Sequence, residues 1–230
     1  MQSSGGRLDS SGECDLYGDF GNEILYRMCA ENPSHANVEI VHGKLWLIGR
    51  AYAASVERKA RKGFLQKHAA QNLVDAGTEI DSKIGDLAKI TRVDASNLTT
   101  VLDAHHYLTE RFRQSTGLAK RSLASKYLHF HARNAVFIYD SIAATRIGKE
   151  MGLMRSARSF RALNGYDETY TAFATRCLQF RDHILEPYLG RPVDPRELDK
   201  YLYSQGAIAT LMPLFSHISL RSSRNAKHDE

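Results

Sequence analysis

Two lysines and one aspartate lie close together in "KRSLASKYLHFHARNAVFIYDS", residues 120–141. A lysine amine that has lost its proton is a nucleophile, and a nearby carboxylate can stabilise positive charge that develops on a substrate. Lys120 and Lys126 are therefore the candidates for an amine nucleophile, and Asp140 is the candidate for the carboxylate.

A helix over 118–131 would place Lys120 in the middle of an apolar stripe. At about 100° per residue, Lys126 borders this stripe. Burial would lower the pKa of Lys120 and favour its neutral, nucleophilic form. In the alternative, Lys120 lies in the first turn and extends its amine past the helix end into water. Four residues are expected on the opposite, polar face of the helix: Arg121, Ser122, Ser125 and His129.

Asp140 comes just before the next apolar periodic segment, where an aspartate typically caps a helix N-terminus. Capping would also fix the carboxylate in one orientation. The connection "ARNAVFIY" is short enough to bring Asp140 and Lys120 together if the two helices pack antiparallel.

The periodicity and the Gly and Pro positions favour helices throughout the chain, so an all-α fold is expected. The run 135–139 is the one short β-like stretch, and 156–167 is a candidate hinge or long loop. We expect disordered tails at 1–12 and 221–230 around a single helical domain over 13–220. The expected helices are 15–31, 37–61, 64–76, 79–91, 96–114, 118–131, 141–153, 166–189 and 195–217.

The chain has a net charge of +5, and its basic residues are concentrated around the two lysines. Residues 110–161 contain eleven Lys or Arg against three acids, whereas residues 69–109 contain six acids against three bases. Such a cluster is either a solvated face or a binding surface for an anionic partner.

The three widely spaced cysteines indicate no disulfide framework and no zinc site, and no apolar run reaches the ~20 residues of a membrane span. We expect a cytoplasmic protein without a metal or cofactor.

The segment "STGLAKRSLASKYLHFHARNAVFIYDS" resembles the core of the helix–hairpin–helix DNA glycosylase superfamily. In that resemblance Gly117 matches the hairpin glycine, Lys120 the catalytic lysine and Asp140 the catalytic aspartate. The chain departs from the pattern in having a single hairpin glycine, no proline before the aspartate and no iron–sulfur cysteines. Lys126 is therefore a rival nucleophile.

The resemblance implies a two-lobed helical domain with a helix–hairpin–helix element and a central cleft that receives a base flipped out of double-stranded DNA. The protein would act as a monomer and excise a damaged or modified base, with AP-lyase activity if a lysine attacks the sugar. A hypermodified phage base is one candidate substrate, which would make this an antiviral defence enzyme. The residues expected to bind the base are Trp46, Arg50, Tyr52, Glu57, Arg58, Ser125 and His131. The residues expected to bind the DNA backbone are Gly117, Arg121, Arg146, Arg155 and Arg158.

Other interpretations remain open. In the alternative interpretation Trp46 belongs to the core, Glu57 and Arg58 are surface charges, and His131 lies in the core or at its boundary. "HFH" does not predict a metal site, because residues i and i+2 of a helix point in nearly opposite directions. The chain could instead be a non-catalytic nucleic-acid-binding module whose basic face holds phosphates, or a helical toxin that cuts RNA.

Overall fold

Helices make up all the regular structure in the residues that the computed structural model describes, which are 12–59, 65–152 and 165–203. This confirms the all-α prediction. The helices are α1 (Gly12–Glu31), α2 (Val38–Tyr52), α3 (Leu65–Asp75), α4 (Gly77–Ala88), α5 (Leu98–Thr116), α6 (Arg121–His131), α7 (Ser141–Gly152), α8 (Glu168–Phe180), α9 (Glu186–Leu189) and α10 (Pro195–Tyr203), with a π-helical turn (Arg181–Leu185) between α8 and α9. The β-like run 135–139 is irregular.

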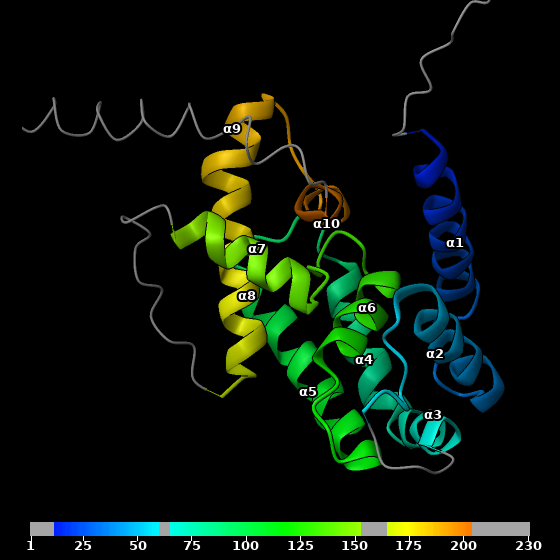
Figure 1. The fold of residues 1–230 in the computed structure, drawn as a ribbon. Helices are drawn as coiled ribbons and strands as arrows, with labels where there is room; N and C mark the ends of the chain where they lie inside the picture. The colour runs from blue at the N-terminus through cyan, green and yellow to red at the C-terminus, as the bar shows by residue number, and fades with distance from the viewer. Residues whose placement is uncertain (1–11, 60–64, 153–164, 204–230) are drawn as a thin grey trace, which may run out of the picture.

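Helix α6 lies at the centre of the molecule (Figure 1) and packs against α1, α2, α4 and α5. In Figure 1, α1, α2 and α3 lie on one side of α5 and α6, and α7, α8 and α9 lie on the other. Helix α7 packs against both α8 and α10. The chain between α6 and α7 thus joins the two sides next to the central helix.

The polar face predicted for α6 is only partly exposed: Arg121 and Ser122 are half-buried, whereas Ser125 and His129 are buried, like every residue from 123 to 130. The polar side chains of this face form internal hydrogen bonds. Ser125 Oγ accepts from the backbone N–H of Tyr139 at 3.0 Å, and His129 contacts Tyr26 Oη at 2.6 Å and the carbonyl of Val136 at 2.8 Å. Buried polar groups are tolerated when they are paired in this way, and helical periodicity alone does not reveal the layer that covers them.

Helix α2 ends at Tyr52, well before the predicted end at residue 61. Ala53 adopts a left-handed conformation with φ 49°, and Arg58 Nη1 donates to its carbonyl at 2.6 Å. Since no glycine or proline lies between 53 and 59, the sequence contains no ordinary stop signal. The chain after α2 is consequently a loop, and this loop forms one wall of the cleft described below.

Helix α5 ends at Thr116 and is capped by Gly117, whose backbone has φ 72° and whose N–H donates to the Arg113 carbonyl at 2.8 Å. A glycine adopts this left-handed conformation without steric cost. A short turn, residues 117–120, then leads into α6.

Several predictions concern residues outside the described ranges. These include the tails at 1–11 and 221–230, the end of the last predicted helix after Tyr203, and most of the predicted loop 156–167. Within the described ranges, helix α1 already begins at Gly12. None of the described helices combines the length and apolar character needed to cross a membrane.

Candidate active site

A cleft of about 520 Å³ opens between the loop after α2, the start of α6 and the start of α7. The loop forms one wall, and the other wall comes from residues 139–142 together with Tyr203 at the end of α10. The predicted site residues that line the cleft are Tyr52, Arg58, Lys120, Arg121, Lys126 and Asp140. The cleft therefore collects both candidate lysines and the candidate carboxylate.

Lys126 is the buried lysine of this site. Only 2% of the residue is exposed, and its Nζ donates to Ser122 Oγ at 2.9 Å, one helical turn earlier. The Nζ atom also lies 3.7 Å from Asp140 Oδ2 and 5.7 Å from the centre of the Tyr52 ring. Burial lowers the pKa of Lys126, and the negative charge of Asp140 opposes this shift. A depressed pKa increases the fraction of neutral, nucleophilic amine near neutral pH.

Asp140 caps α7, as predicted. Its Oδ1 accepts hydrogen bonds from the backbone N–H groups of Ile142 at 2.9 Å and Ala143 at 2.8 Å. Its Oδ2 accepts a hydrogen bond from the hydroxyl of Tyr203. The helix terminus thus holds the carboxylate in one orientation, with one oxygen directed toward the cleft.

Asp140 is paired with Lys126 rather than with Lys120. The chain turns back after α6, and the bond between Tyr139 N–H and Ser125 Oγ places Asp140 beside the middle of that helix. Lys120 lies six residues before Lys126, which corresponds to roughly 9 Å along the helix axis. The Lys120 amine instead donates to the backbone carbonyl of Arg58 on the opposite wall.

Lys120 is neither fully buried nor directed freely into water. Partial burial lowers its pKa, the neighbouring Arg58 lowers it further, and the negative charge of Glu57 opposes both effects. The bond from Lys120 ties the loop after α2 to the start of α6 across the cleft. This loop has a left-handed backbone at Ala53 (φ 49°) and at Lys59 (φ 62°), an unfavourable conformation for residues with a side chain.

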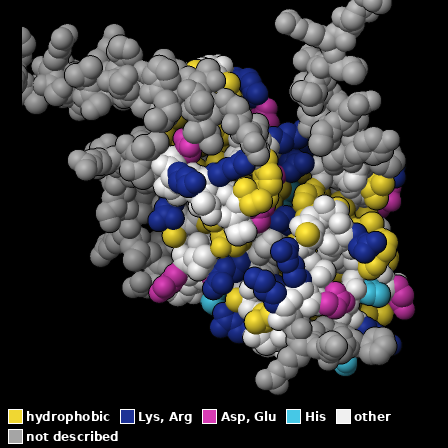
Figure 2. Space-filling model, viewed as in Figure 1, with side chains coloured by type: hydrophobic (Ala, Val, Ile, Leu, Met, Phe, Trp, Pro, Cys, Tyr) yellow, Lys and Arg dark blue, Asp and Glu magenta, His cyan; other side chains and the backbone are white. Residues whose placement is uncertain are grey.

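Positive charge surrounds the cleft. Lys and Arg side chains gather in the middle of the face shown in Figure 2, and Arg58, Lys59, Lys120 and Arg121 line the cleft itself. The Nε of Arg121 donates to both carboxylate oxygens of Asp167 at 2.7 Å, which orients its guanidinium and neutralises part of its charge. The cleft combines a buried amine, a fixed carboxylate and a cationic rim.

Five of the seven residues predicted to bind the base do not line the cleft. Trp46 and Arg50 lie on α2, where the Arg50 guanidinium sits 5.9 Å from the Trp46 ring centre. Trp46 is 52% exposed, so the prediction that it belongs to the core was wrong. Ser125 is buried behind Tyr139, and Glu57 is exposed. His131 lies in a separate cluster, 3.3 Å from Lys44 Nζ and stacked on His35.

The predicted phosphate-binding residues lie in different surroundings. Gly117 caps α5, and Arg146 on α7 donates to the Leu202 carbonyl of α10 while its guanidinium lies 5.9 Å from the Tyr203 ring centre. Arg146 therefore secures α10 against α7. Arg155 and Arg158 lie outside the described residues.

Two residues of α10 were not predicted. Tyr203 lines the cleft and binds Asp140, and Asp199 is a buried carboxylate that interacts electrostatically with Lys126 and Asp140. Burial raises the pKa of Asp199 to about 6, and burial together with the bond to Asp140 raises the pKa of Tyr203. The two residues are four positions apart, so both side chains lie on one face of the helix, but this spacing is common to all helices and does not mark a site in the sequence.

Within the described ranges, no cluster of three or more His, Cys, Asp or Glu side chains is arranged to hold a metal ion. The cleft holds the Lys126 amine beside the Asp140 carboxylate. No protein-family model, curated protein or solved structure matches this chain.

Proposed function

We propose that the protein is a DNA glycosylase with AP-lyase activity, in which Lys126 is the nucleophile and Asp140 stabilises the reacting sugar. The single observation that carries this proposal is the buried Lys126 amine 3.7 Å from the capped Asp140 carboxylate, inside a cleft lined by cationic side chains. The proposal also rests on the resemblance of residues 115–141 to the glycosylase superfamily.

The cationic side chains around the cleft are the reason that we propose DNA as the substrate. Arg58, Lys59 and Lys120 would contact the phosphates on either side of a target nucleotide, because phosphate contacts supply most of the affinity of such proteins. The target base would rotate out of the duplex into the cleft. The rings of Tyr52, Tyr139 and Tyr203 line the cleft and offer flat surfaces on which a base can stack.

The reaction proceeds as a displacement at the anomeric carbon of the sugar. The neutral Lys126 amine forms a bond to this carbon while the glycosidic bond breaks, and the electron pair leaves with the base, which takes up a proton. Asp140 stabilises the positive charge that develops on the sugar. The lysine nitrogen, positively charged after the attack, gives up a proton. The sugar ring then opens: the bond from the anomeric carbon to the ring oxygen breaks, the ring oxygen takes up a proton from water, and the nitrogen is left doubly bonded to the carbon as a protonated Schiff base. Loss of a proton from the neighbouring C2′ carbon then breaks the bond from C3′ to its oxygen, and the 3′ phosphate leaves with that electron pair, which cuts the strand.

The test of this function compares Asp140→Asn with the wild-type protein on duplex oligonucleotides that carry a normal, oxidised, alkylated, deaminated or glucosylated base. We expect Asp140→Asn to bind DNA normally and to release base at least about 100-fold more slowly. Asp75→Asn, which changes an exposed aspartate of α3, is the matched control and should behave as wild type. Release by Asp140→Asn at the wild-type rate would show that the proposed site is wrong.

The same set of oligonucleotides also tests the alternative that the protein binds nucleic acid without catalysing a reaction. A binding module would bind these oligonucleotides with a strong salt dependence that Lys120→Ala reduces, but it would release no base from any of them. Cleavage of RNA without an abasic product would indicate a nuclease instead.

A further inference from the structure

We propose that Tyr203 is a positioning residue that holds the Asp140 carboxylate away from the Lys126 amine until a nucleotide enters the cleft. This inference rests on the proposed function for its role in the reaction, whereas the contact on which it depends can be tested without DNA.

The contacts around Asp140 show a competition for one oxygen atom. Its Oδ1 is held by the two backbone N–H groups at the start of α7. Its Oδ2 accepts from the Tyr203 hydroxyl and lies 3.7 Å from Lys126 Nζ, a separation too long for a hydrogen bond. The lysine donates to Ser122 Oγ at 2.9 Å instead. Tyr203 therefore makes the hydrogen bond to Oδ2, and Lys126 has only a longer ion-pair contact with the same oxygen.

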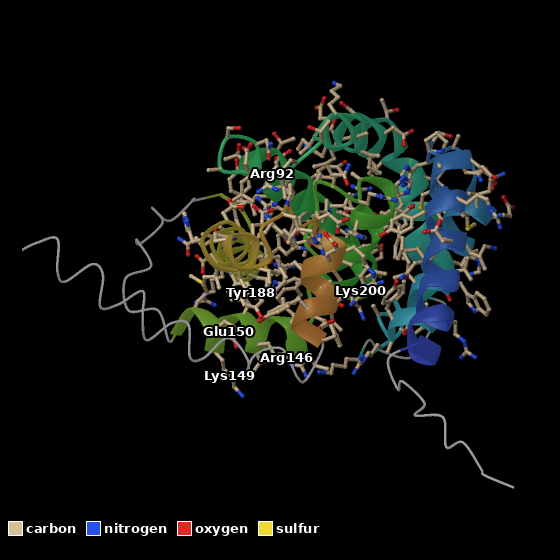
Figure 3. The ribbon with its side chains drawn as sticks, turned by 90° about the horizontal axis from the view of Figure 1, so that it is seen from above. Arg92, Arg146, Lys149, Glu150, Tyr188 and Lys200 are labelled. Carbon is tan, nitrogen blue, oxygen red and sulfur yellow. The ribbon has the colours of Figure 1, made fainter. Side chains whose placement is uncertain are left out.

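Tyr203 is fixed on one side and accessible on the other. Arg146, which lies on α7 beside the end of α10 (Figure 3), places its guanidinium 5.9 Å from the Tyr203 ring centre. Arg146 also donates to the carbonyl of Leu202, the residue before Tyr203. Tyr203 itself lines the cleft and is 42% exposed, so an incoming nucleotide can displace the phenol from Asp140.

This arrangement favours the neutral form of the amine. A hydrogen bond from Tyr203 disperses the negative charge of Asp140, which then stabilises the Lys126 ammonium less strongly. The charged and titratable groups around Lys126 are Asp140 before α7, Asp199 and Tyr203 of α10, Arg58 of the loop after α2, and Tyr52 of α2. Among these groups, the carboxylates raise the pKa of Lys126 and Arg58 lowers it.

The experiment compares Tyr203→Phe with Tyr201→Phe. The second variant makes the same chemical change two residues away on α10, where Tyr201 packs against Phe180. The pH dependence of Lys126 acetylation by acetic anhydride, followed by peptide mass spectrometry, reports the neutral fraction of this one amine without DNA. We expect Tyr203→Phe to raise the apparent pKa of Lys126 by about one unit, a roughly tenfold loss of neutral amine below that pKa. Tyr201→Phe should leave the profile unchanged.

Two further measurements test whether Tyr203 acts by positioning Asp140 rather than by supporting the fold. Arg146→Gln loosens the packing of Tyr203 and should shift the Lys126 profile in the same direction, but less. If the wild-type protein forms a Schiff base with DNA, the rate of its formation should fall as the pH drops below the pKa of Lys126. In Tyr203→Phe this fall should begin at a higher pH, by the same amount as the shift in the acetylation profile.

The outcomes distinguish this inference from the proposed function. No shift in Tyr203→Phe, or an equal shift in Tyr201→Phe, would overturn the positioning role even if base is released. A specific shift in a protein that releases no base from any substrate would support the contact and overturn the glycosylase proposal.

Discussion

Asp199 makes the stability of this protein depend on pH in a way that the structure predicts. Only 6% of this residue of α10 is exposed, and its Oδ2 accepts from Arg196 Nη1 at 2.5 Å. In the part of the chain that the structure describes, its buried Oδ1 has no hydrogen-bond partner. Burial is the largest cause that raises the pKa of Asp199, from an ordinary 3.8 to about 6, and the charge of Asp140 adds to this.

The sign follows from proton binding. Between pH 4 and pH 6 the folded protein holds the Asp199 proton more tightly than the unfolded chain does, so this group lowers stability as the pH rises. A difference of about two pKa units, at about 1.4 kcal/mol each, makes this loss about 3 kcal/mol. Asp199→Asn removes the titration. Part of this loss has already occurred at pH 4, where the unfolded carboxyl is partly ionised, so we expect the free energy of unfolding of Asp199→Asn, relative to wild type, to increase by about 2.5 kcal/mol between pH 4 and pH 7.

The assay is urea unfolding of both proteins across this pH range, followed by circular dichroism. The prediction concerns how the difference in free energy of unfolding between Asp199→Asn and wild type varies with pH. A cost of the substitution that is the same at every pH, such as a weaker contact to Arg196, therefore does not affect it. Asp75→Asn at the exposed position on α3 serves as control and should stay within about 0.5 kcal/mol of wild type at each pH. A difference between Asp199→Asn and wild type that does not vary with pH would refute the reasoning.

Two further predictions concern the elements that carry the site. Phe112 of α5 is fully buried, so Phe112→Ala should lower the free energy of unfolding by about 3–5 kcal/mol in urea denaturation. Gly117→Ala should cost about 1–2 kcal/mol in the same assay, because the left-handed backbone at φ 72° is unfavourable for alanine while open space surrounds its added carbon. Gly117→Asn should lose less, since asparagine tolerates this conformation, and equal losses in the two variants would contradict a cost that arises in the backbone.

The sequence predicts the parts of this molecule that depend on local chemistry. The helix preceding Gly117, the capping of α7 by Asp140 and the all-α fold follow from periodicity and capping signals, and all are confirmed. The end of α2 was not predictable, because its stop comes from the contact of Arg58 with the Ala53 carbonyl and from no local breaker.

The pairing within the site depends on tertiary structure. The sequence placed Lys120 at the centre of an apolar stripe and left Lys126 at its border, whereas in the structure Lys126 is the buried amine beside Asp140. The difference arises because the segment after α6 folds back over the helix and covers the side that periodicity assigns to solvent. Tyr203 comes from a helix more than sixty residues further along the chain, and nothing around residue 140 indicates its contact.

The most direct measurement of the central claim is the identity of the amine that reacts with DNA. The wild-type protein and its Lys126→Ala, Lys120→Ala and Lys89→Ala variants are incubated with duplex DNA that carries the substrate base. Borohydride then reduces any Schiff base, and the stable adduct is located by peptide mass spectrometry. Lys89, which is exposed and outside the cleft, controls for non-specific reaction of surface amines.

We expect an adduct on Lys126 that only Lys126→Ala abolishes, while Lys120→Ala weakens DNA binding and still forms the adduct. An adduct on Lys120 that persists in Lys126→Ala would contradict the assignment of the buried amine as the nucleophile.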